Sequence, residues 1–264
     1  MRVQDVMNRN HPTIYPDELA TKARAFLRDL KLRILPVVGD NKQLLGVVSR
    51  NDVMTISSSV SVMRVKGIMS VARFRATMDM DTAQAAREMV RLDEWYVPVV
   101  KSQHDDAYCG VLGLEHIIRV LYDKKVARLK VPLSDVMSTE QLFICSPDDE
   151  ADNIWHRMKE RSFAACPVVA RGKPVGIVTQ QNLIESGAIF PAFEAKKGRF
   201  KNPSTIITIM RTPALSLKPY NTVGDAAKLM LEKDIGRMPI VDNRGQLVGI
   251  VDREDVVKAL LKQD

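Results

Sequence analysis

The sequence predicts an α+β fold with α/β features, built from four β-α-β-β-α repeats that form two tandem pairs. Three recurring features support this. A proline begins a short apolar run at four places: Pro36, Pro98, Pro167 and Pro239. A glycine follows in a second apolar run after 10, 12, 9 and 10 residues: Gly46, Gly110, Gly176 and Gly249. A phrase ending in methionine opens each stretch: VQDVM at Val3, VKGIM at Val65, LSDVM at Leu133 and IITIM at Ile206. A fixed order repeated four times indicates internal repeats.

Unit 1, residues 1–60, shows the order of elements. A short strand is expected around Thr13-Ile14-Tyr15. A helix follows, because apolar residues are spaced by three and four: Leu19, Ala23, Phe26, Leu27 and Leu30. A hairpin begins at Pro36, and a second helix opens near Asp52, whose charge suits a helix N-terminus. One such unit has too small a core to be stable alone, so pairing is expected.

Units 2, 3 and 4 are residues 61–123, 131–187 and 206–264, and they repeat this order. The first long helix of each unit is expected to have an apolar face. Its residues are Ala85, Met89 and Leu92 in unit 2, Ile154 and Met158 with the following Phe163 in unit 3, and Val223, Ala226, Ala227, Met230 and Leu231 in unit 4. The basic bridge DKKVARLKV separates two tandem pairs, 1–123 and 131–264. A second basic segment, the insert 188–205, precedes unit 4. It is either a solvated linker or a basic flap over a ligand or partner.

Composition is consistent with a globular protein. The 264 residues include 45% apolar residues and carry a net charge of +7. That charge suits nucleic acid, a membrane surface or nucleotide phosphates, or serves solubility alone. The three cysteines show no CxxC spacing and are expected to be buried in a reducing compartment. The first ten residues lack an apolar signal region and no stretch approaches about 20 apolar residues, so we expect a cytoplasmic protein without a membrane partner.

Each repeat follows one pattern, in which h is an apolar residue and x is any residue. The pattern consists of an opening hxDVM, a T-h-x-P strand, h-PVV, and G-h-h-[ST]-x-x-[DN]. Their combination resembles the CBS domain, named after cystathionine β-synthase, over nearly the whole chain except the bridge and the insert. Four units in one chain resemble archaeal four-repeat CBS proteins and the γ subunit of AMP-activated protein kinase. The resemblance implies a disc of four units that binds AMP, ADP, ATP, S-adenosylmethionine or nothing. It also implies a regulatory role toward an unidentified protein target, and it is compatible with a homodimer.

The chemistry of the repeated motif explains its residues. A ribose needs a short carboxylate or amide to hold both hydroxyls, and an aspartate at a helix N-terminus supplies one. A serine or threonine three residues earlier can bind a phosphate oxygen, and a neighbouring arginine adds a charged contact. Unit 1 holds the complete candidate set: Thr13, Ile14, Arg33, Pro36, Ser49, Arg50 and Asp52.

The other units depart from this pattern by degrees. The candidates of unit 4 are Ser216, Arg237, Pro239, Asp252, Arg253 and Asp255. Asp252 replaces the serine and would repel a phosphate unless Arg253 or a cation intervenes, or it could take the ribose of a neighbouring ligand. Unit 3 keeps Thr179 and Asn182 but has alanines where an arginine could stand. Unit 2 has Gly113 and His116 and is expected to lack a ribose contact.

Two alternatives stay open. Asp52, Asn182 and Asp255 could serve only as helix caps. A nucleic-acid binder could use the basic bridge and insert, although few aromatic residues are interleaved with those cations. No GxSxG, HExxH, P-loop or paired-carboxylate arrangement occurs, so we expect no enzyme and no catalytic cofactor. The four histidines are not clustered in the sequence, and no metal site is expected.

Overall fold

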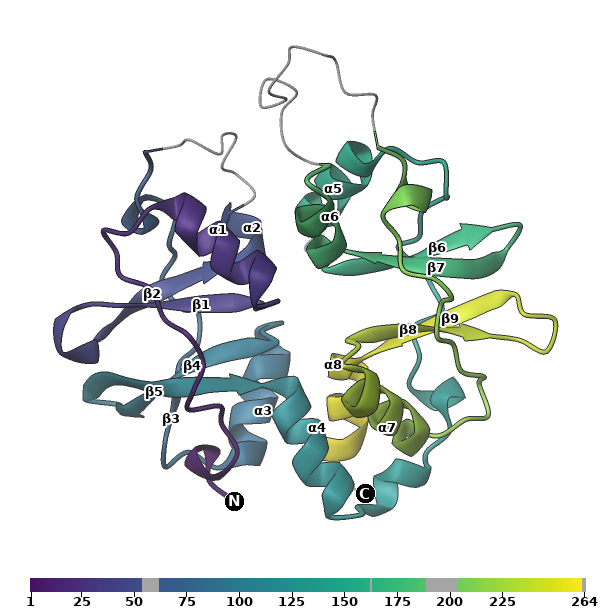
Figure 1. The fold of residues 1–264 in the computed structure, drawn as a ribbon. Coiled ribbons are helices and arrows are strands. Elements are labelled where there is room, and N and C mark those ends of the chain that lie inside the picture. The colour runs from purple at the N-terminus through teal and green to yellow at the C-terminus, as the bar shows by residue number, and fades with distance from the viewer. Residues whose placement is uncertain (54–61, 162, 189–203, 263–264) are drawn as a thin grey trace, which may run out of the picture.

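The four repeats fold as four lobes, each an antiparallel hairpin with helices beside it (Figure 1). The computed structural model describes residues 1–53, 62–161, 163–188 and 204–262. Units 1 and 2 form one side of the molecule and units 3 and 4 the other, which confirms the predicted fold of two tandem pairs. Residues 189–203, most of the basic insert, lie outside the described residues, so the linker and the flap both stay predictions.

The first pair contains four helices and five strands within the described residues. Those of unit 1 are α1 (Ala20–Asp29), β1 (Ile34–Val38), β2 (Leu44–Ser49) and α2 (Arg50–Val53). Those of unit 2 are β3 (Ala76–Thr77), α3 (Thr82–Arg91), β4 (Tyr96–Ser102), β5 (Asp105–Gly113) and α4 (Leu114–Asp123). Short 3-10 turns at Val3–Asp5 and Val65–Gly67 form the opening phrases.

The second pair repeats this order. Unit 3 contains α5 (Ala151–Glu160), β6 (Ala165–Ala170), β7 (Lys173–Thr179) and α6 (Gln180–Ser186). Unit 4 contains α7 (Val223–Lys233), β8 (Arg237–Val241), β9 (Leu247–Asp252) and α8 (Arg253–Leu261). Within the described ranges no helix is long and apolar enough to cross a membrane.

The first strand of each repeat is shorter than predicted. In unit 1 only Ile14 pairs, through a single parallel bridge to Val37. Prolines flank this segment at Pro12 and Pro16, and proline cannot donate to a sheet ladder. Unit 2 has no proline there, and it alone forms a named strand, β3, which pairs in parallel with β4.

The opening phrases explain the repeated glycines. The residue after each phrase's methionine bridges to the returning strand of the other unit in the pair: Asn8 to Val111, Ser70 to Val47, Ser138 to Ile250 and Arg211 to Ile177. A Cβ at Gly46 would lie 2.6 Å from the carbonyl oxygen of Ser70, so only glycine allows this approach. The phrase and the glycine recur together because they touch across each pair.

The two pairs meet through different chemistry at the two ends of the molecule. Units 2 and 4 share one apolar core, in which α3 and α4 pack against α7 and α8. Its fully buried members include Met89, Ile118, Met230 and Val257. Units 1 and 3 have separate cores and meet through polar contacts. The Gln180 side chain donates to Asn51 Oδ1 at 2.9 Å, and Gln181 donates to the Arg28 carbonyl at 2.8 Å. The pairs therefore form one continuous body.

Candidate ligand-binding site

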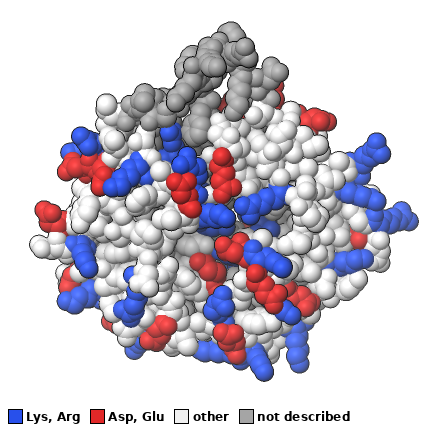
Figure 2. All heavy atoms as spheres, in the orientation of Figure 1, with Lys and Arg blue, Asp and Glu red and all other residues white. Residues whose placement is uncertain are grey.

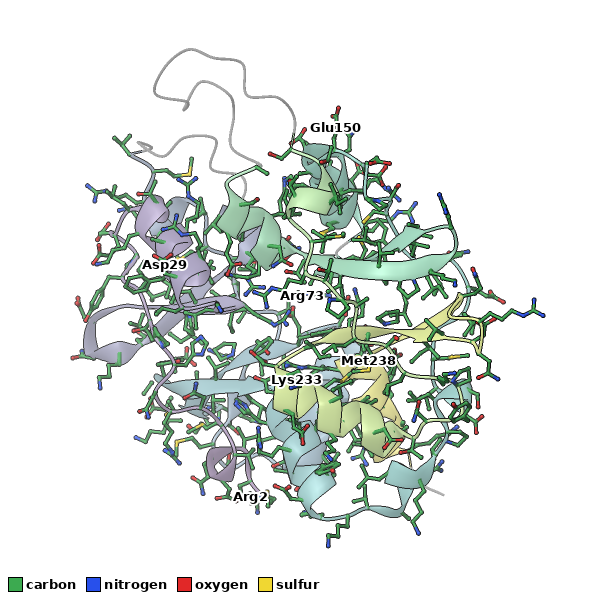
Figure 3. The ribbon with its side chains drawn as sticks, turned by 45° about the vertical axis from the view of Figure 1, so that its right-hand side comes forward. Arg2, Asp29, Arg73, Glu150, Lys233 and Met238 are labelled. Carbon is green, nitrogen blue, oxygen red and sulfur yellow. The ribbon has the colours of Figure 1, made fainter. Side chains whose placement is uncertain are left out.

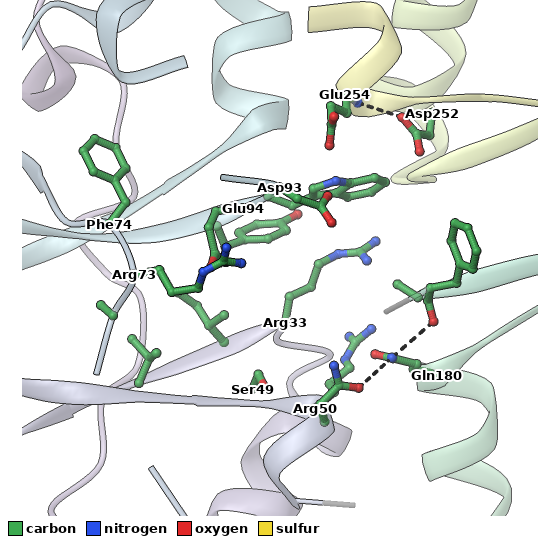
Figure 4. Close-up of a pocket in the computed structure, with 18 of the residues that line it drawn as sticks. Arg33, Ser49, Arg50, Arg73, Phe74, Asp93, Glu94, Gln180, Asp252 and Glu254 are labelled. Carbon is green, nitrogen blue, oxygen red and sulfur yellow. Dashed lines mark hydrogen bonds and ion pairs between the residues drawn. The ribbon is translucent and has the colours of Figure 1, made fainter. Parts of the chain in front are cut away.

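A cavity of about 660 Å³ lies where the four units meet. Figure 3 places Arg73, one of its lining residues, near the centre of the molecule, while Arg2 and Glu150 lie at the periphery. Figure 4 shows the cavity with Asp93, Asp252 and Glu254 on one side and Ser49 and Arg50 on the other. Arg33 extends between the two groups. We call these two sides the unit 1 end and the unit 4 end.

Ser49 and Asp52 form the polar wall of the unit 1 end. The Ser49 hydroxyl and backbone N–H both donate to Asp52 Oδ2, each at 2.6 Å. The Asp52 N–H donates back to the Ser49 hydroxyl oxygen at 3.3 Å. This is a reciprocal helix cap, as the capping alternative predicts, and both residues also line the cavity. Capping and ligand binding are therefore compatible at this position.

The same capping position is filled in all four units. His116 Nδ1 accepts from the Gly113 N–H at 3.0 Å, and Asn182 Oδ1 accepts from the Thr179 N–H at 3.1 Å. Asp255 Oδ2 accepts from the Asp252 N–H at 3.0 Å. Sequence position alone therefore accounts for a cap in every unit, and a ligand role must be argued from what else surrounds each residue.

Two arginines give the unit 1 end its positive charge. Arg50 is only 6% exposed and donates to the carbonyls of Leu32 and Lys31 at 2.8 and 2.9 Å. Burial, and then the neighbouring Arg33, lower the pKa of Arg50 to about 9. Arg33 lies over the rings of Trp95 and Tyr96, 5.7 Å from each centroid. Neither guanidinium forms an ion pair within the described part of the chain, so neither charge is neutralised by a direct carboxylate partner there.

The unit 4 end is rich in carboxylates instead. Asp252 accepts from the backbone N–H groups of Glu254 and Asp255, and it forms an ion pair with Arg237 at 2.8 Å. Burial, and then the charge of Asp252, raise the pKa of Asp255 to about 7. Burial, and then Glu254, raise the pKa of Asp93 to about 6. An added phosphate would meet like charges at this end.

Arg253 does not line the cavity, although the sequence suggested a phosphate contact. It is 1% exposed and donates to the Tyr96 hydroxyl at 2.7 Å, to Glu115 Oε2 at 3.1 Å and to Asp234 Oδ1 at 2.8 Å. Six other candidates also lie outside the cavity lining: Thr13, Ile14, Pro36, Asn182, Ser216 and Pro239. Their predicted ligand contacts therefore gain no support from the geometry.

A second cavity of about 300 Å³ is also lined by residues of all four units. Thr179 lines it, and the Thr179 hydroxyl donates to Asn182 Oδ1 at 2.8 Å. Asn182 itself is buried behind Thr179 and is outside the lining. Arg237 lines both cavities.

Sequence reasoning missed the contribution of the other unit in the pair. Ser70, Val71 and Ala72, directly after the phrase VKGIM, line the unit 1 end beside Ser49 and Asp52. Trp95 and Tyr96 of unit 2 complete the wall. The recurrence of the opening phrase could have suggested a shared role. The spacing of the phrase along the sequence does not indicate which unit the phrase contacts.

Charge on the visible surface is mixed in sign. Figure 2 shows Lys and Arg interspersed with Asp and Glu around the centre of this face. Nucleic-acid binding uses a continuous basic surface, and the described residues on this face instead alternate in sign. Among the residues that the structure describes, no group of three His, Cys, Asp or Glu side chains is placed to hold a metal ion.

The fold defines a tandem-repeat module with cavities between its units. The sequence model of the CBS domain matches residues 3–59, 133–188 and 206–262, more than half of the chain. The chain belongs to the CBS domain family. Unit 2, in which Gly113 and His116 replace the usual polar pair, lies outside these matches.

Similar proteins include MJ1225 of Methanocaldococcus jannaschii, 22% identical over 95% of both chains. The crystal structure of MJ1225, described as a candidate archaeal homologue of γ-AMPK, has a TM-score of 0.85 over 98% of this chain and 99% of that one. MJ1404 of the same organism is 24% identical over 97% of this chain, which spans only 61% of MJ1404. A structure of CBSX2 in complex with AMP, 25% identical with a TM-score of 0.42, covers 49% of this chain and 95% of CBSX2.

Proposed function

We propose that this chain is a non-catalytic regulatory protein that binds an adenosine-containing ligand in the central cavity, chiefly at the unit 1 end. The observation that carries the proposal is the joint position of Ser49 and Asp52 in a cavity wall that also holds Arg33 and Arg50. The cavity's volume of about 660 Å³ lies within the range of small-molecule sites.

Each group has a distinct task in this proposal. Asp52 accepts hydrogen bonds from the two ribose hydroxyls, because a carboxylate can accept both. Ser49 and the guanidinium of Arg33 bind the 5′ substituent, and a phosphate there supplies the anion that Arg33 and Arg50 lack. Trp95 offers an aromatic face beside this position. AMP, ADP and ATP fit this charge better than S-adenosylmethionine, whose sulfonium would meet two guanidiniums.

Regulation would follow from where the ligand sits. The cavity is lined by all four units, so a bound ligand contacts both pairs and favours one arrangement of them. The regulated protein target lies in another polypeptide. A thermal-shift series with AMP, ADP, ATP, NAD and S-adenosylmethionine identifies the ligand class, because a ligand at 100 times its Kd stabilises the folded chain by about 2.7 kcal/mol.

The direct test is calorimetric titration of Asp52→Ala with AMP, ADP and ATP. Removing a charged acceptor from two hydroxyls costs about 1.5–3 kcal/mol, which is roughly a ten- to hundredfold loss of affinity. The loss of the cap also costs about 1 kcal/mol of folding stability.

Asp225→Ala is the matched control. Asp225 accepts from the N–H and hydroxyl of Thr222 at 2.8 and 3.0 Å, so its cap resembles that of Asp52, but Asp225 lies outside the central cavity. We expect it to lose stability with nucleotide affinity unchanged, and His116→Ala at unit 2 to leave affinity unchanged too. Equal affinity of Asp52→Ala and the wild-type chain would refute the proposal.

A further inference from the structure

Two of the three cysteines lie in direct contact inside unit 3. The Sγ atoms of Cys145 and Cys166 are 3.2 Å apart, although the two residues are 21 positions apart in the chain. Cys166 is fully buried, and Cys145 is 5% exposed. The third cysteine, Cys109, lies on β5 of unit 2 and is only partly buried. The sequence predicted three buried thiols, whereas the structure buries two of them and brings these two together.

The backbone holds the two thiols on neighbouring segments. The Cys145 N–H donates to the Pro167 carbonyl at 3.1 Å, and the Cys145 carbonyl accepts from the Val169 N–H at 2.8 Å. Cys145 therefore lies opposite Val168 in an isolated parallel bridge, and Cys166 is its diagonal neighbour. An S–S bond is about 2.0 Å long, so the sulfurs must approach by roughly a further 1 Å. Because one bridge and no full strand joins this segment to β6, only a short segment has to move.

The two sulfurs differ in reactivity. The hydrogen bond of Cys166 to Cys145, and then burial, raise the pKa of the Cys166 thiol. The positive charges of Arg157 and Arg237 act in the opposite direction, because they favour the thiolate. Cys145 is the more exposed sulfur, and the Arg157 guanidinium donates to the Ile144 carbonyl directly before it at 3.4 Å. Cys145 is therefore placed to react first with a reagent from solvent, and Cys166 to react second with Cys145.

We propose that Cys145 and Cys166 are a redox-modification site, at which a reversible disulfide forms with a low-molecular-weight disulfide as the oxidant. Cys145 loses its proton and attacks one sulfur of the reagent, so that a mixed disulfide forms on Cys145 and the other half leaves as a thiolate. Cys166 then loses its proton and attacks Cys145 Sγ, which releases the second half. The two leaving thiolates take up the two protons. Two protein thiols are oxidised, and the reagent is reduced to two thiols.

The cross-link stabilises unit 3. It closes a loop that contains the whole of α5, and it joins two segments of one core cluster. That cluster is separate from the large core of units 2 and 4, so it gains no support from that core. A cross-link restricts the unfolded chain and raises stability without new contacts in the folded chain. The chain therefore responds to oxidising conditions through the stability of one unit.

The test incubates the folded chain in glutathione buffers that range from fully reduced to fully oxidised, and it maps disulfides by peptide mass spectrometry. We expect one cross-link, between Cys145 and Cys166, in most chains in the oxidised buffers. The fraction of linked chains should be the same whether the chain begins reduced or oxidised. A second sample is refolded from urea in the same buffers, because the burial of both sulfurs slows their reaction in the folded chain.

Cysteine variants separate this pair from random pairing. Cys109→Ser is the matched control and should keep the cross-link, whereas Cys166→Ser removes it. In oxidised buffer, the Tm of the wild type and of Cys109→Ser should be about 5 °C higher than in reduced buffer, with no rise in Cys166→Ser. No link between Cys145 and Cys166 in either sample, or links to Cys109 that are equally frequent, overturns the site. A complete cross-link that leaves the Tm unchanged overturns the stabilisation of unit 3.

Discussion

Arg50 and Arg253 occupy equivalent positions in units 1 and 4, each directly after the residue that caps a helix. Arg50 donates only to backbone carbonyls, and burial with the adjacent Arg33 lowers its pKa to about 9. Burial also works to lower the pKa of Arg253, but Tyr96, Glu115 and Asp234 outweigh it, and the pKa is raised. The repeat places an arginine at the same position in both units, but the surrounding residues differ. Arg50 lines the central cavity, whereas Arg253 is buried and donates to Tyr96, Glu115 and Asp234.

The capping carboxylates of the two units show the same difference. Asp52 accepts from a serine hydroxyl, whereas Asp255 lies beside a second carboxylate, Asp252. Unit 4 has Asp252 at the position where unit 1 has Ser49, and this difference adds a carboxylate to the unit 4 end of the cavity. The two ends of the same cavity therefore differ in the charge of the residues that line them.

The largest effect is expected from removing the anchor. Arg253→Met leaves Glu115 and the Tyr96 hydroxyl without their buried partner, and we expect a loss of about 3 kcal/mol in the free energy of unfolding. Arg50→Met removes two hydrogen bonds but also a buried charge beside Arg33, so its loss should be about 1 kcal/mol or less. Urea denaturation of both variants measures the contrast. Equal losses would contradict the assignment of different roles.

A smaller effect concerns pH and Asp255. Its folded pKa of about 7 is raised above the unfolded value of 3.8, so the folded chain binds more protons between these values. Stability from this group is present at low pH and falls as pH rises toward 7. Asp255→Asn keeps the acceptor, as Asn182 does in unit 3, and removes the charge. We expect the variant to exceed the wild type by about 2 kcal/mol at pH 8 and by almost nothing at pH 4.

Asp225→Asn is expected to change the pH dependence of stability in the opposite direction. The Thr222 backbone N–H lowers the pKa of Asp225, so its contribution is present above the unfolded pKa and lost as pH falls. The variant should be less stable than the wild type at pH 8, and this deficit should shrink as the pH falls below the unfolded pKa of 3.8. Thermal denaturation of both variants across pH 3–8 gives the two profiles. Parallel profiles for the two variants would contradict the contrast between the caps.

The smallest effect is a gain of binding at the unit 4 end. Asp252→Ser restores the residue found in unit 1, keeps a good helix cap and releases Arg237 from its ion pair at 2.8 Å. In an Asp52→Ala background, which silences the unit 1 end, we expect AMP affinity to rise about tenfold, or about 1.4 kcal/mol. Calorimetric titration measures the gain. Unchanged affinity would show that Asp252 does not set the charge preference.

Much of the fold was readable from the sequence. The recurrence of Pro36 and Gly46 in four copies predicted the hairpins, because both residues have few alternative uses within a strand. The apolar spacing around Ala23 and Leu27 predicted the helices, and both residues are fully buried. The cap at Asp52 followed from the preference of serine and aspartate for helix N-termini. These are local properties, set by a few neighbouring residues.

Only the tertiary structure decided the partners of these elements. It brought Ser70 to Gly46, Trp95 between Arg33 and Arg237, and Arg253 to Glu115, contacts that cross between units. The spacing along a repeat is the same whichever unit it meets, so the sequence carries no signal for that choice. The surroundings of a buried charge determine its pKa and its role, and they come from segments far apart in the chain. For this reason the sequence alone predicted the same phosphate-contacting role for Arg50 and Arg253. The packing of units 2 and 4 instead buries Arg253 against Glu115 and away from the cavity.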